Sequence, residues 1–158
     1  MNDSKYTKEH PFIQELIQKR MCYQDTYSHI AAFITKDPCF SNIAVGQNSD
    51  RSPCSNNKIK THAEIDALHK INNMIRNKKI KRRNKLNLIV LRINKSGNLC
   101  ESAPCHHCSH ELMNQNLCID TLYFSTADGS IKSIKFTHWM SRSDFHTSKG
   151  WKWMNQDR

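Results

Sequence analysis

The fold and the predicted active site of this chain are organised around two segments: T-H-A-E-I-D-A-L at residues 61–68 and S-A-P-C-H-H-C at residues 102–108. The first contains His62, and the second contains Cys105 and Cys108, three positions apart. Zinc in a catalytic site takes three protein ligands and leaves a fourth position for water. Two cysteines at this spacing, at the start of a helix, lie on one side of its first turn. The segments therefore predict a zinc ion (Zn²⁺) held by His62, Cys105 and Cys108.

Glu64 follows the predicted ligand His62 by two residues. Zinc lowers the pKa of a water bound to it to about 7, which makes hydroxide available at neutral pH. A carboxylate facing that water can take its proton and pass it to a ring nitrogen and a leaving amine. We therefore predict Glu64 as the catalytic acid–base group. These parts match hydrolytic deamination of an amino-substituted ring.

Two other metal sites compete with this interpretation. A purely structural zinc site could use Cys100, Cys105, Cys108 and Cys118. The spacing Cys100-x4-Cys105-x2-Cys108 also matches that of plant-type iron–sulfur proteins. Neither site accounts for His62 and Glu64, so we favour the catalytic zinc centre.

Composition limits the class of protein. The 158 residues suit one domain, and seven cysteines, an odd number, indicate free thiols in a reducing compartment. With no signal-like apolar segment, we expect an intracellular protein, cytoplasmic or nuclear. A mean hydropathy of −0.73 and the lack of a long apolar run exclude a membrane span and predict no membrane partner. The net charge of +10 favours a polyanionic partner or a phosphorylated substrate.

Hydrophobic periodicity predicts alternating helices and strands. Helices are expected at 11–21, from an N-cap at Thr61 through Met74, and at 105–116; strands are expected at 28–35, 42–46, 86–93, 119–125 and 131–136. A polar loop is expected between residues 47 and 60. Because the turn at 127–130 is too short for a crossover, the last two strands must be antiparallel. The fold class is thus α/β, a three-layer α/β/α arrangement with a five-stranded mixed sheet.

The chain ends and one internal segment differ in composition from the predicted domain at 11–137. Residues 1–10 are polar and predict a flexible N-terminus. The tail at 138–158 contains Trp139, Trp151 and Trp153, and we expect it to pack on the same domain rather than to stack on bases. Residues 76–85 are strongly basic: they are either the solvated end of a helix or a nucleic-acid patch or nuclear-localisation signal.

The pattern H-x-E … P-C-x-x-C resembles the signature of zinc-dependent nucleobase deaminases, and residues 12–137 resemble the cytidine deaminase-like superfamily. Residues 61–68 resemble the first metal motif of deoxycytidylate and tRNA deaminases. The nucleoside enzymes usually have Cys where this chain has His62. Residues 123–131 nevertheless resemble the final antiparallel hairpin of the nucleoside enzymes, as does Tyr27-Ser28-His29 before a strand.

The resemblance also implies substrate contacts. Asn48 would bind a sugar hydroxyl, and Asp50 would stand where the nucleoside enzymes have Glu. Ala63 and the backbone of Ser102 and Ala103 would hydrogen-bond the base. Members of this superfamily often assemble as dimers or tetramers, which makes a homo-oligomer an expectation here.

These observations predict a zinc-dependent hydrolytic deaminase. The expected reaction converts cytosine to uracil in a free (deoxy)cytidine nucleoside or nucleotide and releases ammonia. One alternative is an editing deaminase that acts on cytosine or adenine in RNA or single-stranded DNA and binds the strand through residues 76–85. The other is a catalytically silent deaminase-fold protein that binds nucleic acid.

Overall fold

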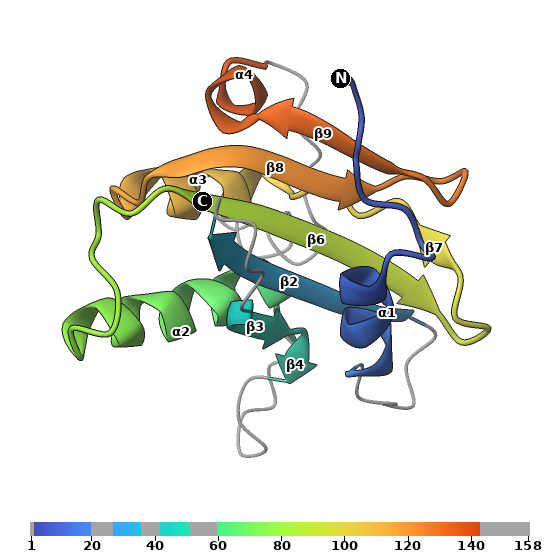
Figure 1. Cartoon of the computed structure of the whole chain (residues 1–158), viewed down its shortest axis with the longest axis horizontal. Helices are drawn as coiled ribbons and strands as arrows, with labels where there is room; N and C mark the ends of the chain where they lie inside the picture. The colour runs from blue at the N-terminus through green and yellow to red at the C-terminus, as the bar shows by residue number, and fades with distance from the viewer. Residues whose placement is uncertain (1, 20–26, 36–41, 51–59, 143–158) are drawn as a thin grey trace, which may run out of the picture.

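A mixed β-sheet forms the middle layer of the computed structural model, which describes residues 2–19, 27–35, 42–50 and 60–142 (Figure 1). The strand order is β1-β9-β8-β6-β2-β3, with β7 pairing with β6 beside this path. The strands are β1 (Asn2–Asp3), β2 (Tyr27–Thr35), β3 (Asn42–Gln47), β6 (Leu86–Asn94), β7 (Leu99–Cys100), β8 (Ile119–Ser125) and β9 (Ile131–Lys135). The helices are α1 (Pro11–Gln18), α2 (Ala63–Arg76), α3 (His106–Asn114) and α4 (Phe136–Met140).

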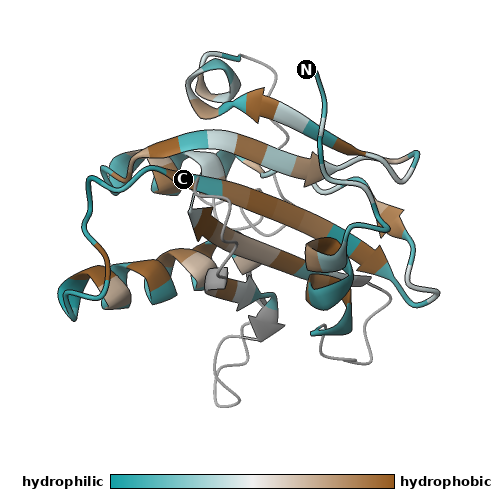
Figure 2. Cartoon of the chain, in the orientation of Figure 1, coloured by the Kyte–Doolittle hydropathy of each residue, from teal (hydrophilic) through white to brown (hydrophobic). Residues whose placement is uncertain are grey.

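Side-chain alternation in the central strands explains why both faces of the sheet are covered. In β2, Ile30 and Ile34 point to one face, and Ala31 and Phe33 point to the other. The N-terminal segment and α1 pack on the first face, whereas α2, α3 and α4 pack on the second. Figure 2 shows the resulting apolar band along β2 and β6. This arrangement confirms the predicted three-layer α/β/α class.

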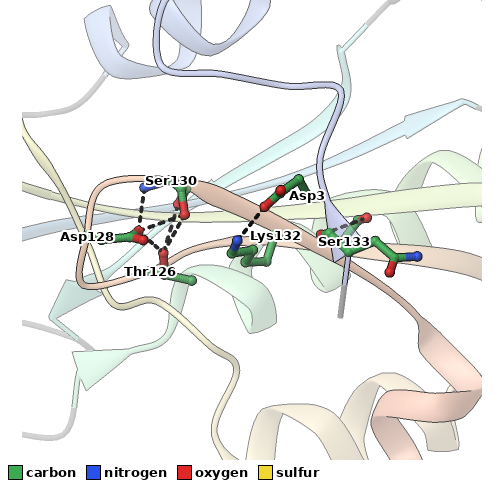
Figure 3. Close-up of polar contacts among 7 residues, drawn as sticks. Asp3, Thr126, Asp128, Ser130, Lys132 and Ser133 are labelled. Atoms are coloured by element: carbon green, nitrogen blue, oxygen red, sulfur yellow. Dashed lines mark hydrogen bonds and ion pairs between the residues drawn. The ribbon is translucent and has the colours of Figure 1, made fainter.

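The strand predicted at 86–93 is β6, at the centre of the sheet. It runs parallel to β8 and antiparallel to β2 and β7. The last two strands, β8 and β9, are antiparallel, as predicted. Their turn contains Gly129 at φ +82°, and the Asp128 carboxylate accepts hydrogen bonds from Ser130 N and Ser130 Oγ (Figure 3).

The sheet has more strands than the five predicted, because β1 and β7 join it. Both additions are two-residue strands, too short to produce a periodic pattern. β1 pairs with β9, and the Lys132 ammonium donates to the Asp3 carboxylate (Figure 3). Tyr6 is 1% exposed against the α1 face. Residues 2–10 thus contact the domain, in contrast to the flexible terminus predicted for residues 1–10.

At the other end of the chain, α4 follows β9 directly. Phe136 and Trp139 are buried in the core on the α2 face, and Trp139 Nε1 donates to Ser109 Oγ at 3.0 Å. Trp151 and Trp153 lie outside the described residues. No helix within the described segments is both long and apolar enough to cross a bilayer.

The loop predicted between residues 47 and 60 contains two short strands instead, β4 (Ser49–Asp50) and β5 (Lys60–Thr61). They pair antiparallel, with Ser49 opposite Thr61. Thr61 therefore belongs to a strand, and the N-cap of α2 is His62 rather than the predicted Thr61. Because the pairing ends next to Asn48 and His62, it brings these two residues to the same edge of the fold.

Gly46 of β3 allows α2 to approach the sheet closely. A Cβ atom at this position would lie 2.2 Å from the backbone nitrogen of Ala67 and 2.3 Å from the carbonyl oxygen of Ala63. Both atoms belong to the helix backbone, so neither can move without moving α2. The position of His62 and Glu64 therefore depends on a residue without a side chain in the neighbouring strand.

We expect Gly46→Ala to displace the start of α2. The clash should cost at least about 2 kcal/mol in the free energy of unfolding, because overpacking against backbone cannot relax by a rotamer change. Urea unfolding and zinc content measure the two consequences. The control is Val45→Ala, because Val45 packs on the opposite face and should leave zinc content unchanged. Parental stability and zinc content in Gly46→Ala would contradict this account.

Candidate metal centre

His62 is positioned by the start of α2. It is the N-cap residue, with φ −71° and ψ 150°, and its side chain does not cap the helix. The imidazole extends toward α3, where its Nδ1 lies 3.2 Å from Cys108 Sγ and 3.6 Å from Cys105 Sγ. Nδ1 is therefore the ring nitrogen that faces both sulfurs.

Cys105 and Cys108 are positioned by the start of α3. Cys105 is the N-cap residue, and Cys108 lies within the first turn, so both sulfurs lie at the same end of the helix. The exposed fractions are 5% for Cys105 and 0% for Cys108, and Ile65 of α2 packs against both. A helix N-terminus favours negative charge, so this location favours thiolates.

The donor atoms of these three residues form a compact group that could hold a metal ion, hereafter the metal-binding group. His62, Cys105 and Cys108 each offer one ligand atom, and all three atoms lie within 4.8 Å of one another. Across 2–19, 27–35, 42–50 and 60–142, no other group of three or more His, Cys, Asp or Glu is placed to hold a metal ion. Cys100 and Cys118 do not belong to the group, which argues against the four-cysteine and iron–sulfur alternatives.

The two thiols differ in acidity. A hydrogen bond from Cys108, followed by one from His62, lowers the pKa of Cys105 to about 3, although burial opposes this shift. The hydrogen bond to Cys105, together with burial, raises the pKa of Cys108. The metal-free pair thus holds one thiolate and one thiol. Metal binding would release the second proton, because cysteine binds zinc as thiolate.

Glu64 lies in the first turn of α2, beside the metal-binding group. Its side chain is 5% exposed, and burial raises its pKa to about 7, although its own backbone N–H and His62 lower it. A carboxyl group with a pKa near neutrality can both accept and donate a proton at physiological pH. The predicted acid–base residue is therefore buried, close to His62, and suited to proton transfer.

Asn48 lies at the same edge of the fold as His62 and is held there by β2. Its side-chain oxygen accepts a hydrogen bond from the backbone N–H of His29 at 3.0 Å, and the backbone N–H of Asn48 donates to the His29 carbonyl oxygen at 3.3 Å. These bonds fix Asn48 against β2 and use the side-chain oxygen as the acceptor. Asp50 lies in β4, and its side chain lies outside the described part of the structure.

The other residues predicted to contact the base flank the metal-binding group. Ala63 is buried at the first position of α2, and Ala103 is half-buried against the core. Ser102 donates to the Val90 carbonyl at 2.7 Å through its hydroxyl and to the Ser125 carbonyl at 2.9 Å through its N–H. These bonds fix the segment that leads into Cys105, and any base contact by Ser102 would have to use its carbonyl oxygen. The substrate-binding assignments remain predictions.

Two features of the site were not predicted as such. His29 is half-buried and has its pKa lowered to about 4, first by burial and then by Arg92 and His62. It therefore stays neutral beside the metal-binding group. Ser125 joins Ser102 through its Oγ at 2.8 Å, which ties β8 to the cysteine segment. A resemblance of Tyr27-Ser28-His29 to the nucleoside enzymes was the only sequence signal for His29.

A crystal structure of cytidine deaminase from Burkholderia pseudomallei superposes on this chain with a TM-score of 0.52. The chain has the fold of a cytidine deaminase. The match covers 79% of this chain and 87% of the other, at 13% sequence identity. No protein-family model and no curated protein matches the sequence. At this identity the likeness establishes the fold alone.

Proposed function

We propose that this chain is a zinc-dependent hydrolytic deaminase, which converts cytosine to uracil in a free (deoxy)cytidine nucleoside or nucleotide and releases ammonia. One observation supports this most directly. The buried carboxyl group of Glu64 lies two residues from His62, whose Nδ1 faces the sulfurs of Cys105 and Cys108. A structural zinc site needs no such carboxyl group, so its burial supports a catalytic role.

The donor set suits zinc. One imidazole nitrogen and two sulfurs are ligands that Zn²⁺ accepts readily, and three protein ligands match a catalytic rather than a structural site. His62, Cys105 and Cys108 would hold the ion. Zinc bound there would supply a water acidic enough to attack at neutral pH.

Glu64 would move the protons of the reaction. Its carboxylate would take a proton from the attacking water and deliver it to N3 of the cytosine ring. Once the bond from oxygen to C4 has formed, Glu64 would take the remaining proton from the new C4 hydroxyl group and pass it to the amino nitrogen, and the bond from C4 to that nitrogen would break to release ammonia. A pKa near 7 suits both directions of transfer.

Two features of the chain bear on the class of substrate. The antiparallel β8–β9 hairpin resembles that of nucleoside enzymes and supports a small substrate. The exposed basic residues at 76–85 favour the second candidate, an enzyme that edits cytosine or adenine within a strand. A silent deaminase-fold protein is disfavoured, because the chain has a buried glutamate, Glu64, beside three residues that could hold a metal ion.

A deamination panel read by mass spectrometry tests the proposal. Zinc-loaded protein is incubated with cytidine, deoxycytidine, CMP, dCMP, a cytosine-containing single-stranded oligonucleotide and an adenosine-containing RNA, each beside Glu64→Ala. We expect a gain of about 1 Da in at least one free nucleoside or nucleotide, the result of replacing NH by O, with no gain in the variant. Turnover of the polymer alone would favour the editing enzyme, and no turnover of any substrate would favour the silent protein.

A further inference from the structure

A strongly basic segment connects α2 to β6. Residues 76–85, hereafter the basic segment, contain seven lysines and arginines and no acidic residue, so most of the net charge of +10 comes from it. All seven side chains are exposed: Arg76, Lys78, Lys79, Lys81, Arg82, Arg83 and Lys85. Figures 1 and 2 show the segment as a hydrophilic loop at one end of the molecule.

Local structure does not account for these cations. A cation in the last turn of a helix stabilises the helix dipole, but only Arg76 lies there, and six of the seven follow the helix. Within the described residues, the ion pairs between side chains involve none of the seven. Arg82 donates to the carbonyl oxygen of Gln115, which fixes the loop without neutralising charge. The cations are therefore available to an anionic partner.

The basic segment is held in a defined shape. Ile80 is 8% exposed and packs into the core on the α2 face. Lys79 N donates to the Met74 carbonyl, Asn84 N donates to the Lys81 carbonyl, and Lys78 adopts a left-handed conformation at φ 58°. The cations are thus presented from an anchored turn, and a partner would pay little entropy to order it.

The basic segment and the metal centre lie at opposite ends of α2. His62 precedes the helix, and the basic segment begins at its last residue, Arg76. Fourteen helical residues rise about 20 Å. A mononucleotide bound at the metal centre could not reach the basic segment, so the segment suits a polyanion that extends well beyond the reacting base.

We propose that the basic segment is a docking surface for the phosphate backbone of single-stranded nucleic acid, separate from the metal centre. Seven closely spaced cations complement the regular charge of a phosphate backbone. The segment has no aromatic residue for base stacking, so its contacts are to phosphates and independent of sequence. The choice of a single strand rests on the second candidate function, because a deaminase that edits a base within a strand acts on that base outside the duplex.

Fluorescence anisotropy with a labelled single-stranded oligonucleotide of mixed sequence tests this surface. The protein is zinc-loaded Glu64→Ala, so that the strand is not altered during the measurement. Reversing two exposed cations in Lys81→Glu/Arg83→Glu should weaken binding at least about tenfold. Losing two phosphate contacts should also reduce the slope of log affinity against log salt by about 1.4.

The matched control, Lys5→Glu/Lys95→Glu, changes the net charge by the same amount. Lys95 lies beyond the far end of β6, about 30 Å along the strand from the basic segment, and both control lysines are exposed. Because salt screens charges that are this far from the bound strand, the control variant should lose at most about twofold in affinity for the oligonucleotide. Equal losses in the two variants, or no loss in Lys81→Glu/Arg83→Glu, would overturn the proposal. Binding to anionic lipid vesicles but not to the oligonucleotide would also overturn it. Because binding is measured without turnover, a failed deamination panel leaves this result interpretable.

Discussion

Cys105→Ser protein should retain almost no zinc after purification and should show no deaminase activity. Cys105 supplies one of three donor atoms that lie within 4.8 Å of one another. A serine hydroxyl does not ionise at neutral pH and cannot replace a thiolate. The loss of zinc affinity should well exceed the 10- to 100-fold that changes to residues behind the ligands typically cause. Elemental analysis and a competitive zinc chelator measure it.

Cys100→Ser/Cys118→Ser is the matched control for this experiment. Both cysteines lie outside the metal-binding group, and Cys118 is exposed. The double variant should bind zinc as the parent does. Full zinc occupancy in Cys105→Ser, or loss of zinc in the double variant, would contradict the ligand set of His62, Cys105 and Cys108.

Glu64→Ala should keep its zinc and its fold but lose at least 10²- to 10⁴-fold in kcat, the usual contribution of general acid–base catalysis. The physical reason is that Glu64, whose buried carboxyl group lies beside His62, is the residue that we propose for proton transfer. Turnover and zinc content are measured on the same preparation. The control is Glu101→Gln, because Glu101 is exposed near the second metal motif and should leave kcat unchanged. Retained turnover in Glu64→Ala would remove Glu64 from the mechanism.

Stability measurements give an independent check on the burial of Glu64. Burial raises its pKa from 4.5 to about 7, so the metal-free folded protein binds more protons than the unfolded chain between these pH values. The contribution of Glu64 to stability should therefore be fully present below about pH 4.5 and be lost as pH rises through about 7. Glu64→Gln removes this penalty. In the metal-free state it should be more stable than the parent at pH 8 by on the order of 3 kcal/mol, and equal to it in acid.

Much of the site could be predicted because its residues are close in sequence. His62 and Glu64 span the start of one helix, and Cys105 and Cys108 span the first turn of another. Residues this close in sequence on one helix lie near each other in space, whatever the tertiary fold. The central strand could also be predicted, because Leu86–Asn94 is buried on both faces over most of its length and is therefore mostly apolar.

Other features depend on residues that are distant in sequence. β1 consists of two polar residues, and it pairs with β9, which lies about 130 positions away in the sequence. The pairing of β4 with β5 moved Thr61 out of the helix cap and left His62 there. β1, β4 and β5 each have two residues, which is too few to show the alternation of apolar and polar side chains that identifies a strand.

The sequence by itself determined the α/β/α layers and the antiparallel final hairpin, and it supplied the candidate ligand types and the candidate acid–base residue, because each follows from local spacing or periodicity. Only the tertiary structure decided how Gly46 admits α2 against the sheet and that Asn48 is held by the backbone of His29. It also placed the basic segment at the far end of α2 from the metal centre. The physical reason is that these features arise where separate elements meet, and packing between distant residues is not encoded in any one segment.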